Sequence, residues 1–172
     1  MSSGFIGDAK KVEQTFTYQV GRFVLAFGSI EHATYLCLHT IPRDDIAQFV
    51  KNLSLGARLD LLAEILASRA GPEVGRLLFW LNKVKKFTEH RNLVAHNGLS
   101  LNVFQGDGKL EFLTEIVSAR DKTKRVSLAQ VTKLANEADE LGQQFGAAVL
   151  AAVKALCDAN GNPHVTESLR LV

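Results

Sequence analysis

Only three prolines occur in the 172 residues of this chain, which leaves long stretches open to helix formation. Pro42, Pro72 and Pro163 each fall where a helix would naturally start or stop. Between them, apolar residues recur at the spacing of one helical face. This periodicity predicts a first helix over about residues 8–38, a break at 41–44 and a short second helix that ends at about Val50. A third helix is predicted to begin after the cap residue Ser54, and a fourth to run from Pro72 to a stop at Gly98. The last predicted helix runs from Ser127 to about residue 157.

The period changes from helical to two after Gly98, the residue at which we expect the preceding helix to stop. Alternate apolar residues follow on both sides of the turn sequence at 106–108. This pattern predicts a β-hairpin over about residues 99–117. The charged run at 120–125 is interpreted as a loop or a frayed third strand.

These patterns together predict a mainly α fold, a bundle of about five helices with a small β-hairpin inserted before the last helix. We assign one domain to residues 1–172, with a core at about 8–157 and a loose C-terminal tail. The last helix is rich in alanine and glycine, so a neighbouring helix can approach it closely within the bundle or across a dimer interface.

The composition restricts the surroundings in which the chain works. With 20 Lys+Arg against 18 Asp+Glu the net charge is only +2, so a basic surface has to come from local clustering. Cys37 and Cys157 show no pairing motif and are interpreted as small buried hydrophobes in a reducing compartment, with a lone disulfide or a reactive thiol as the alternatives. The N-terminus lacks signal-peptide features, and the apolar run at 147–157 is too short to span a bilayer. We expect a cytoplasmic protein with no membrane association.

Motifs for metals and cofactors are absent from the sequence. The five histidines form no His-Glu-x-x-His pattern, and the two cysteines form no Cys-x-x-Cys pattern. No phosphate loop, dinucleotide fingerprint or serine elbow occurs either. The sequence therefore predicts no cofactor and no metal site.

The most unusual stretch is residues 89–97, Glu-His-Arg-Asn-Leu-Val-Ala-His-Asn, near the end of the helix that begins at Pro72. Arg91 follows apolar positions by four and seven residues, so it projects near the inward face and needs a partner. His96 is five residues further on, about 140° around an ideal helix. Arg91 and His96 are therefore expected to flank the edge of a groove together with Asn92.

A carboxylate on the first helix is the candidate partner for this arginine. Glu31 continues the apolar stripe of that helix, four residues after Phe27, and is positioned to meet Arg91. His32 or Arg58 are the alternatives.

An arginine, a polar residue, three further residues and a histidine near the end of a long helix resemble the motif of the HEPN domain (higher eukaryotes and prokaryotes nucleotide-binding) family. Here the motif spans Arg91 to His96, with asparagine as the polar residue. The long first helix carrying Glu31 and the closing long helix are also similar to the layout of that family. The hairpin at about 99–117 departs from the minimal bundle.

The resemblance implies metal-independent endoribonuclease activity, a homodimer in which two motifs form one cleft, and a role as a toxin or phage-defence effector. In that scheme His96 is the general acid or base, Arg91 binds the phosphate, Asn92 orients His96 or the substrate, and Glu31 fixes Arg91. RNA is the expected partner, with an antitoxin or operon partner besides. RNA-backbone contacts are expected from basic side chains on the motif helix: Lys83, Lys85, Lys86 and His90.

Each of these residues also has a structural interpretation. Arg91 and Glu31 can form a plain ion pair between helices, and His96 can cap the carbonyl groups of the helix end. The corresponding functions are a non-catalytic interaction or dimerisation module, or a nucleotide-binding domain that uses Arg91 as an anion site.

Overall fold

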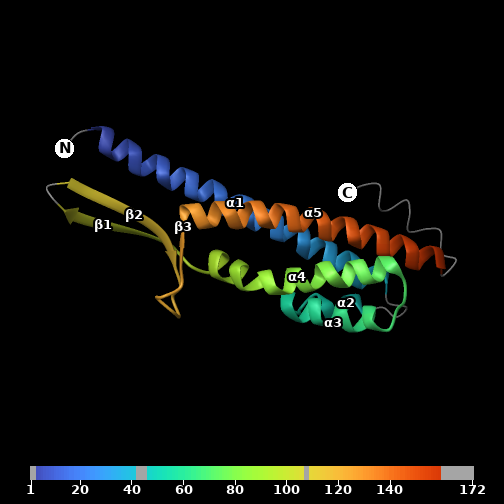
Figure 1. Cartoon of the computed structure of the whole chain (residues 1–172). Coiled ribbons are helices and arrows are strands. Elements are labelled where there is room, and N and C mark those ends of the chain that lie inside the picture. Colours follow the sequence, from blue (N-terminus) through green and yellow to red (C-terminus); the bar gives the residue numbers. More distant parts are fainter. Residues whose placement is uncertain (1–2, 42–45, 107–108, 160–172) are drawn as a thin grey trace. The chain divides into compact units, whose positions relative to one another are not determined.

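The computed structural model describes residues 3–41, 46–106 and 109–159, and these form a mainly α fold with a small sheet before the last helix, as predicted (Figure 1). Its elements in chain order are α1 (Ser3–Thr40), α2 (Ala47–Val50), α3 (Leu55–Ala67), α4 (Pro72–Ala95), β1 (Leu99–Gly106), β2 (Lys109–Val117), β3 (Arg125–Ser127) and α5 (Leu128–Ala159). The expected break at 41–44 lies mostly outside the described residues, as does the tail after Asn160.

The predicted helix starts are confirmed by their capping groups. Ser54 adopts an extended conformation before α3, and its hydroxyl accepts a hydrogen bond from the Ala57 N–H at 3.3 Å. Pro72 is the first residue of α4, where its missing N–H costs no helical hydrogen bond. Gly71 before it has a φ of 134°, a conformation that a residue with a side chain rarely adopts.

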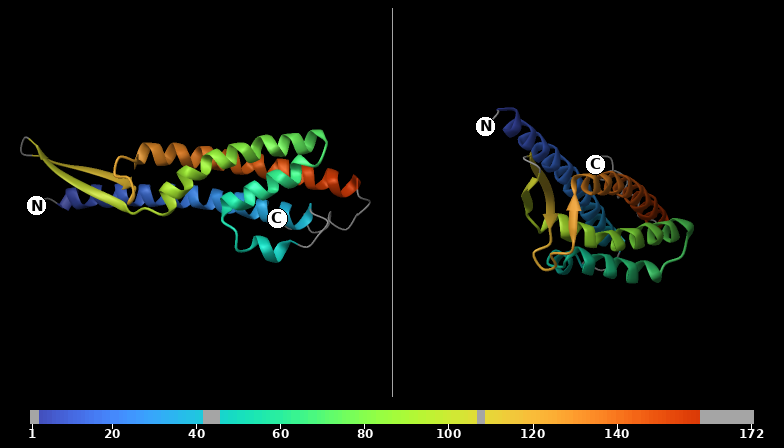
Figure 2. Two further views of the ribbon diagram at one scale, coloured as in Figure 1. Left: turned by 90° about the horizontal axis from the view of Figure 1, so that it is seen from below. Right: turned by 60° about the vertical axis from the view of Figure 1, so that its left-hand side comes forward.

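The three strands form one antiparallel sheet in the order β1-β2-β3. The register pairs Leu99 with Ile116 at one end of the hairpin and Gly106 with Lys109 at the other, which confirms the predicted β-hairpin. The expected turn at 107–108 lies outside the described residues. β3 pairs with the end of β2 and leads directly into α5, so the charged run supplies both a loop and a short strand (Figure 2).

The contacts of the chain group into two compact units, and α1, α4 and α5 contribute segments to both. The first unit comprises the described parts of 1–26 and 89–139; it contains the sheet, and its buried side chains include Phe16, Phe23, Val94, Ile116, Val126, Val131, Leu134 and Ala138. The second comprises the described parts of 27–88 and 140–172; its buried side chains include Phe27, Ile30, Leu38, Leu59, Leu62, Leu77, Leu81, Val84, Phe145 and Val149. The apolar stripes predicted from the periodicity thus supply both cores.

Among the described residues, no helix combines the length and the apolar character that crossing a membrane requires. The described cysteines, Cys37 and Cys157, are both free thiols rather than a disulfide pair.

A reciprocal pair of side chains begins α5. The Ser127 hydroxyl accepts a hydrogen bond from the Gln130 N–H at 3.3 Å, and the Gln130 side chain accepts one from the Ser127 N–H at 2.8 Å. The N–H groups at the start of a helix have no carbonyl acceptor within the helix. Here the side chains of Ser127 and Gln130 accept hydrogen bonds from two of them.

We predict that Ser127→Ala lowers the free energy of unfolding by about 1 kcal/mol, because the cap acceptor is lost. The urea midpoint should fall accordingly. Ser127→Thr keeps a hydroxyl at the cap and should unfold close to the wild type. Equal midpoints for the alanine variant and the wild type would contradict a stabilising cap.

We also predict that a thiol-specific disulfide reagent titrates only Cys157 in the folded protein. Burial raises the pKa of the Cys37 thiol to about 12, and this side chain has no exposed surface. Cys157 is partly exposed, although burial and the nearby Asp158 charge raise its pKa and slow the reaction. Denaturant should release the second thiol, and Cys157→Ser should abolish the native reaction. Two thiols reacting at one rate in the native protein would exclude this arrangement.

Candidate functional site

The end of α4 carries the motif and belongs to the first unit. Val94 is buried, Arg91 is half-buried, and Asn92 and His96 are exposed. The helix ends at Ala95, so Gly98 lies beyond the residues that cap it, and the predicted glycine stop is wrong. Gly98 does not adopt the left-handed conformation of a glycine cap.

Asn97 ends the helix in place of glycine. Its amide Nδ2 donates a hydrogen bond to the Leu93 carbonyl at 2.7 Å, and the His96 N–H donates one to the Asn92 carbonyl at 3.3 Å. The other side-chain atom of Asn97, Oδ1, accepts a hydrogen bond from the Ala119 N–H at 2.8 Å. One half-buried amide thus satisfies the helix end and ties it to the segment after β2.

Arg91 and His96 are in direct contact: Arg91 Nη1 lies 2.9 Å from His96 Nε2. An ideal helix would separate these positions by about 140°. His96 is the first residue after α4, and the long arginine side chain reaches its ring there. Arg91 Nη1 also donates to Asn92 Oδ1 at 3.4 Å. The three residues of the predicted motif therefore lie together.

This contact determines where the imidazole carries its proton. A guanidinium only donates hydrogen bonds, so His96 Nε2 must be the acceptor. This hydrogen bond fits the tautomer whose ring proton is assigned to Nδ1. A neutral imidazole is the form that can accept a proton from a substrate.

The other predicted site residue, Glu31, belongs to the second unit. Its carboxylate accepts a hydrogen bond from Arg58 Nη2 at 3.4 Å, which is one of the alternatives that the sequence left open. The Arg58 guanidinium is buried and lies over the Tyr35 ring, 4.1 Å from its centroid. The pairing of Glu31 with Arg91 stays a prediction.

The predicted RNA-binding lysines of α4 have neighbours in the second unit. Lys83 Nζ lies over the rings of Phe79 and Trp80, 4.7 and 4.6 Å from their centroids. Lys85 forms an ion pair with Asp60. Lys86 is exposed, and the role of all three in RNA binding stays a prediction.

A groove of about 1110 Å³ in the first unit is lined by the motif. His90, Asn92 and His96 line it from the end of α4. Arg91 contacts two of these three side chains and is not itself among the described residues that line the groove. Four basic residues of α4 were predicted to bind RNA. Of these four, only His90 is among the described residues that line the groove.

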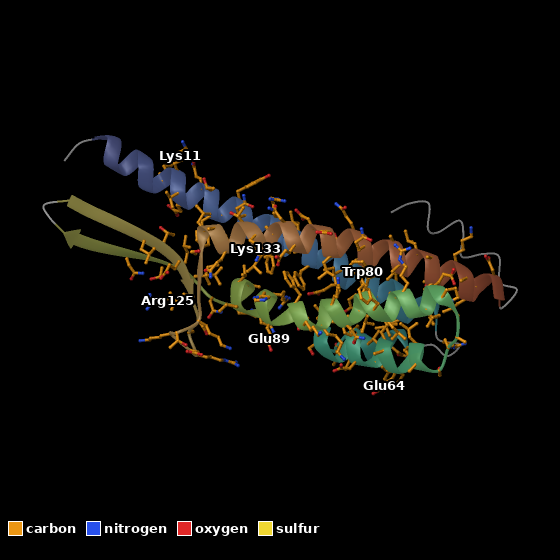
Figure 3. The ribbon with its side chains drawn as sticks, in the orientation of Figure 1. Lys11, Glu64, Trp80, Glu89, Arg125 and Lys133 are labelled. Atoms are coloured by element: carbon orange, nitrogen blue, oxygen red, sulfur yellow. The ribbon has the colours of Figure 1, made fainter. Side chains whose placement is uncertain are left out.

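Basic residues far from the motif in sequence line the same groove. Arg120, Lys124 and Arg125 come from the segment between β2 and β3 and from β3 itself, and Lys133 comes from α5. Figure 3 labels Glu89, Arg125 and Lys133, which line the groove from α4, β3 and α5. The run at 120–125 was predicted only as a loop or a frayed third strand, although its positive charge was a signal for a basic groove lining.

The segment at 118–124, here called the β2–β3 loop, is held by its own hydrogen bonds. The Ser118 N–H donates to the Lys124 carbonyl at 3.0 Å, and the Lys124 N–H donates to the Asp121 carbonyl at 2.9 Å. Asp121 Oδ1 accepts from the Thr123 N–H at 3.0 Å and from its hydroxyl at 2.6 Å. These bonds from Thr123 lower the pKa of the Asp121 carboxyl, so the carboxylate stays ionised at neutral pH.

Within the described parts of the chain, no three His, Cys, Asp or Glu side chains gather in a way that could hold a metal ion. Comparisons with protein-family models, with curated proteins and with solved structures find no match to this chain. The geometry of the groove is therefore the basis for the functional proposal below.

We predict that Asn97→Ala lowers the free energy of unfolding by about 1–3 kcal/mol, because two side-chain hydrogen bonds are lost. The Ala119 amide should also exchange its hydrogen faster, since its acceptor is gone. Hydrogen-exchange NMR checks this directly.

Asn97→Asp is the matched variant, because it keeps the Oδ1 acceptor for Ala119 and removes the donor to Leu93. Protection of the Ala119 amide should survive in it, while the carboxylate at the helix end lowers stability. Unchanged exchange at Ala119 in the alanine variant would show that Asn97 does not hold the loop.

Proposed function

We propose that this chain is a metal-independent endoribonuclease of the HEPN type. The observation that carries the proposal is the contact of Arg91 Nη1 with His96 Nε2, 2.9 Å apart, beside a groove that basic side chains also line. If Arg91 served only in an ion pair between helices, it would not need His96 beside its guanidinium. If His96 served only to cap the helix, it would not need a groove next to it. A site that cleaves phosphodiesters needs both the histidine at the guanidinium and the groove.

The chemistry follows from the two side chains. RNA supplies its own nucleophile, the 2′-hydroxyl, so the protein has to remove one proton and stabilise charge on the phosphate. His96 Nε2 takes the proton of the 2′-hydroxyl while the 2′-oxygen bonds to phosphorus. The guanidinium of Arg91 binds the phosphate oxygens, on which negative charge increases. The bond from phosphorus to the 5′-oxygen breaks, leaving a 2′,3′-cyclic phosphate and a 5′-hydroxyl.

Substrate binding would also activate the base. In the structure the Nε2 lone pair is engaged by Arg91, and a base needs that lone pair for the substrate proton. Phosphate oxygens are charged acceptors and compete for the guanidinium more strongly than a neutral imidazole does. A phosphate that binds Arg91 therefore frees Nε2 at the moment when the 2′-hydroxyl arrives.

Further parts of the proposal come from the family resemblance. The departing 5′-oxygen needs a proton, and in a homodimer His96 of a second copy would supply it. The remaining parts are Asn92 as the group that orients His96, Glu31 as the group that fixes Arg91, and a toxin or defence role with an antitoxin partner. The in-line path of this reaction requires a flexible backbone, so single-stranded RNA is the proposed substrate.

We predict that the purified protein cleaves labelled single-stranded RNA in excess EDTA and leaves 2′,3′-cyclic phosphate ends. His96→Ala should reduce the rate by at least about 100-fold, because general acid–base catalysis contributes that much. Arg91→Ala should reduce it as well, and Arg91→Lys should restore only part of the rate because the forked donor is lost. Product ends are identified by their resistance to phosphatase until acid opens the cyclic phosphate.

Arg76→Ala and His39→Ala are the matched controls, since both residues are exposed and belong to the second unit. They should cleave at the wild-type rate. Intact RNA with a folded, inhibitor-free wild type across neutral pH would overturn the proposal. Arg91 would then be a structural residue, and its replacement should lower the melting temperature without any effect on RNA.

A further inference from the structure

The cations of the groove differ in how they are paired. Arg125 Nη1 lies 3.0 Å from a Glu115 oxygen and Lys133 Nζ lies 3.7 Å from a Glu137 oxygen, so carboxylates offset both charges. Arg120 and Lys124 are exposed and form no ion pair with any described residue. Both project from the β2–β3 loop into the space that His96 lines. These two side chains are the cations of the groove that remain available to a ligand.

The β2–β3 loop, which carries Arg120 and Lys124, is held in position by hydrogen bonds. Its internal hydrogen bonds run between Ser118, Asp121, Thr123 and Lys124, and the Ser118 side chain is buried. Asn97 fixes the loop to the end of α4, next to His96 in sequence. A loop fixed before binding loses little conformational entropy when a ligand arrives. The position of the two cations relative to the motif is therefore set by protein contacts rather than by the ligand.

The groove is large enough for a segment of a nucleic-acid strand. Its volume of about 1110 Å³ lies near the upper end of the roughly 300–1,000 Å³ that is usual for small-ligand pockets. Its charged lining comprises Arg120, Lys124, Arg125 and Lys133 against Glu89 and Glu137, which is four minus two, or +2. That equals the net charge of the whole chain, so the remaining residues balance to zero.

We propose that the β2–β3 loop is the phosphate-binding wall of the groove, and that Arg120 and Lys124 bind the RNA backbone next to the phosphate held by Arg91. The inference rests on the proposed ribonuclease function for the identity of the ligand. It assigns backbone binding to the segment that follows the hairpin, in addition to the lysines of α4. Binding of this kind depends on phosphate charge, so it is sensitive to salt and indifferent to base sequence.

The test measures binding apart from cleavage. A fluorescein-labelled 2′-O-methyl oligoribonucleotide has no 2′-hydroxyl, so it cannot be cleaved, and its anisotropy reports Kd. Arg120→Gln/Lys124→Gln should raise Kd at least about tenfold, which corresponds to the loss of two phosphate contacts. The slope of log Kd against log salt should decrease by about 1.4, because each phosphate contact on a single strand contributes about 0.7.

The matched control is Lys11→Gln/Lys154→Gln, which removes the same charge from two exposed lysines outside the groove lining. It should keep the wild-type Kd and slope. Melting temperatures should be unchanged in both glutamine variants, because all four side chains are exposed.

The outcomes separate this inference from the proposed function. Wild-type cleavage together with normal binding by the Arg120→Gln/Lys124→Gln variant would overturn the phosphate-binding wall and leave the ribonuclease intact. Loss of binding in that variant alone, with no cleavage of ordinary RNA by the wild type, would keep the wall and overturn the ribonuclease. Equal weakening by the control variant, or no binding by any protein, would also overturn the wall.

Discussion

Ending α4 without a glycine cap is the constraint on which the geometry of the site depends. The last carbonyl groups of a helix need donors, and Asn97 supplies one through its side chain. The same amide binds the backbone of Ala119 with its oxygen, so the helix end and the β2–β3 loop share one residue. His96 is the first residue after this helix, and its ring lies within reach of Arg91. The motif and the groove wall thus have a common structural origin.

The contact between Arg91 and His96 has two chemical readings that the same atoms permit. As a resting contact, it is a hydrogen bond that favours the tautomer with the ring proton on Nδ1. As a catalytic device, it couples occupation of the guanidinium by phosphate to release of the base. The catalytic interpretation requires a groove that binds the substrate, whereas the structural interpretation does not. The basic lining is therefore what favours a function over a purely structural contact.

Much of the fold could be predicted from the sequence because its signals are local. The caps at Ser54 and Ser127, the proline that opens α4 and the alternating hairpin each depend on residues within a few positions of one another. The stop at Gly98 was wrong because an asparagine one residue earlier satisfies the helix end, which leaves the glycine without that role.

The candidate site was only partly predictable. Arg91, Asn92 and His96 lie within six positions, so the sequence predicted them at one groove edge, but ideal spacing would set Arg91 and His96 about 140° apart and did not predict their direct contact. That the loop carrying Arg120 and Lys124 lines the same groove depends on a hydrogen bond between residues 22 positions apart, which no periodicity reveals. The partner proposed for Arg91 lies even further away in sequence, and Glu31 has Arg58 beside it.

Among the described residues Arg120 and Lys124 have no ion-pair partner, which has a consequence for how such a protein can change over generations. Substitutions at exposed side chains of this kind leave the stability of a fold nearly untouched. Mutation can therefore strengthen or weaken the proposed binding of a nucleic acid there without a penalty in folding. Positions such as Asn97 lack this freedom, because they support two segments at once. The exposed cations of the groove wall can therefore change independently of the residues, such as Asn97, that hold the wall in position.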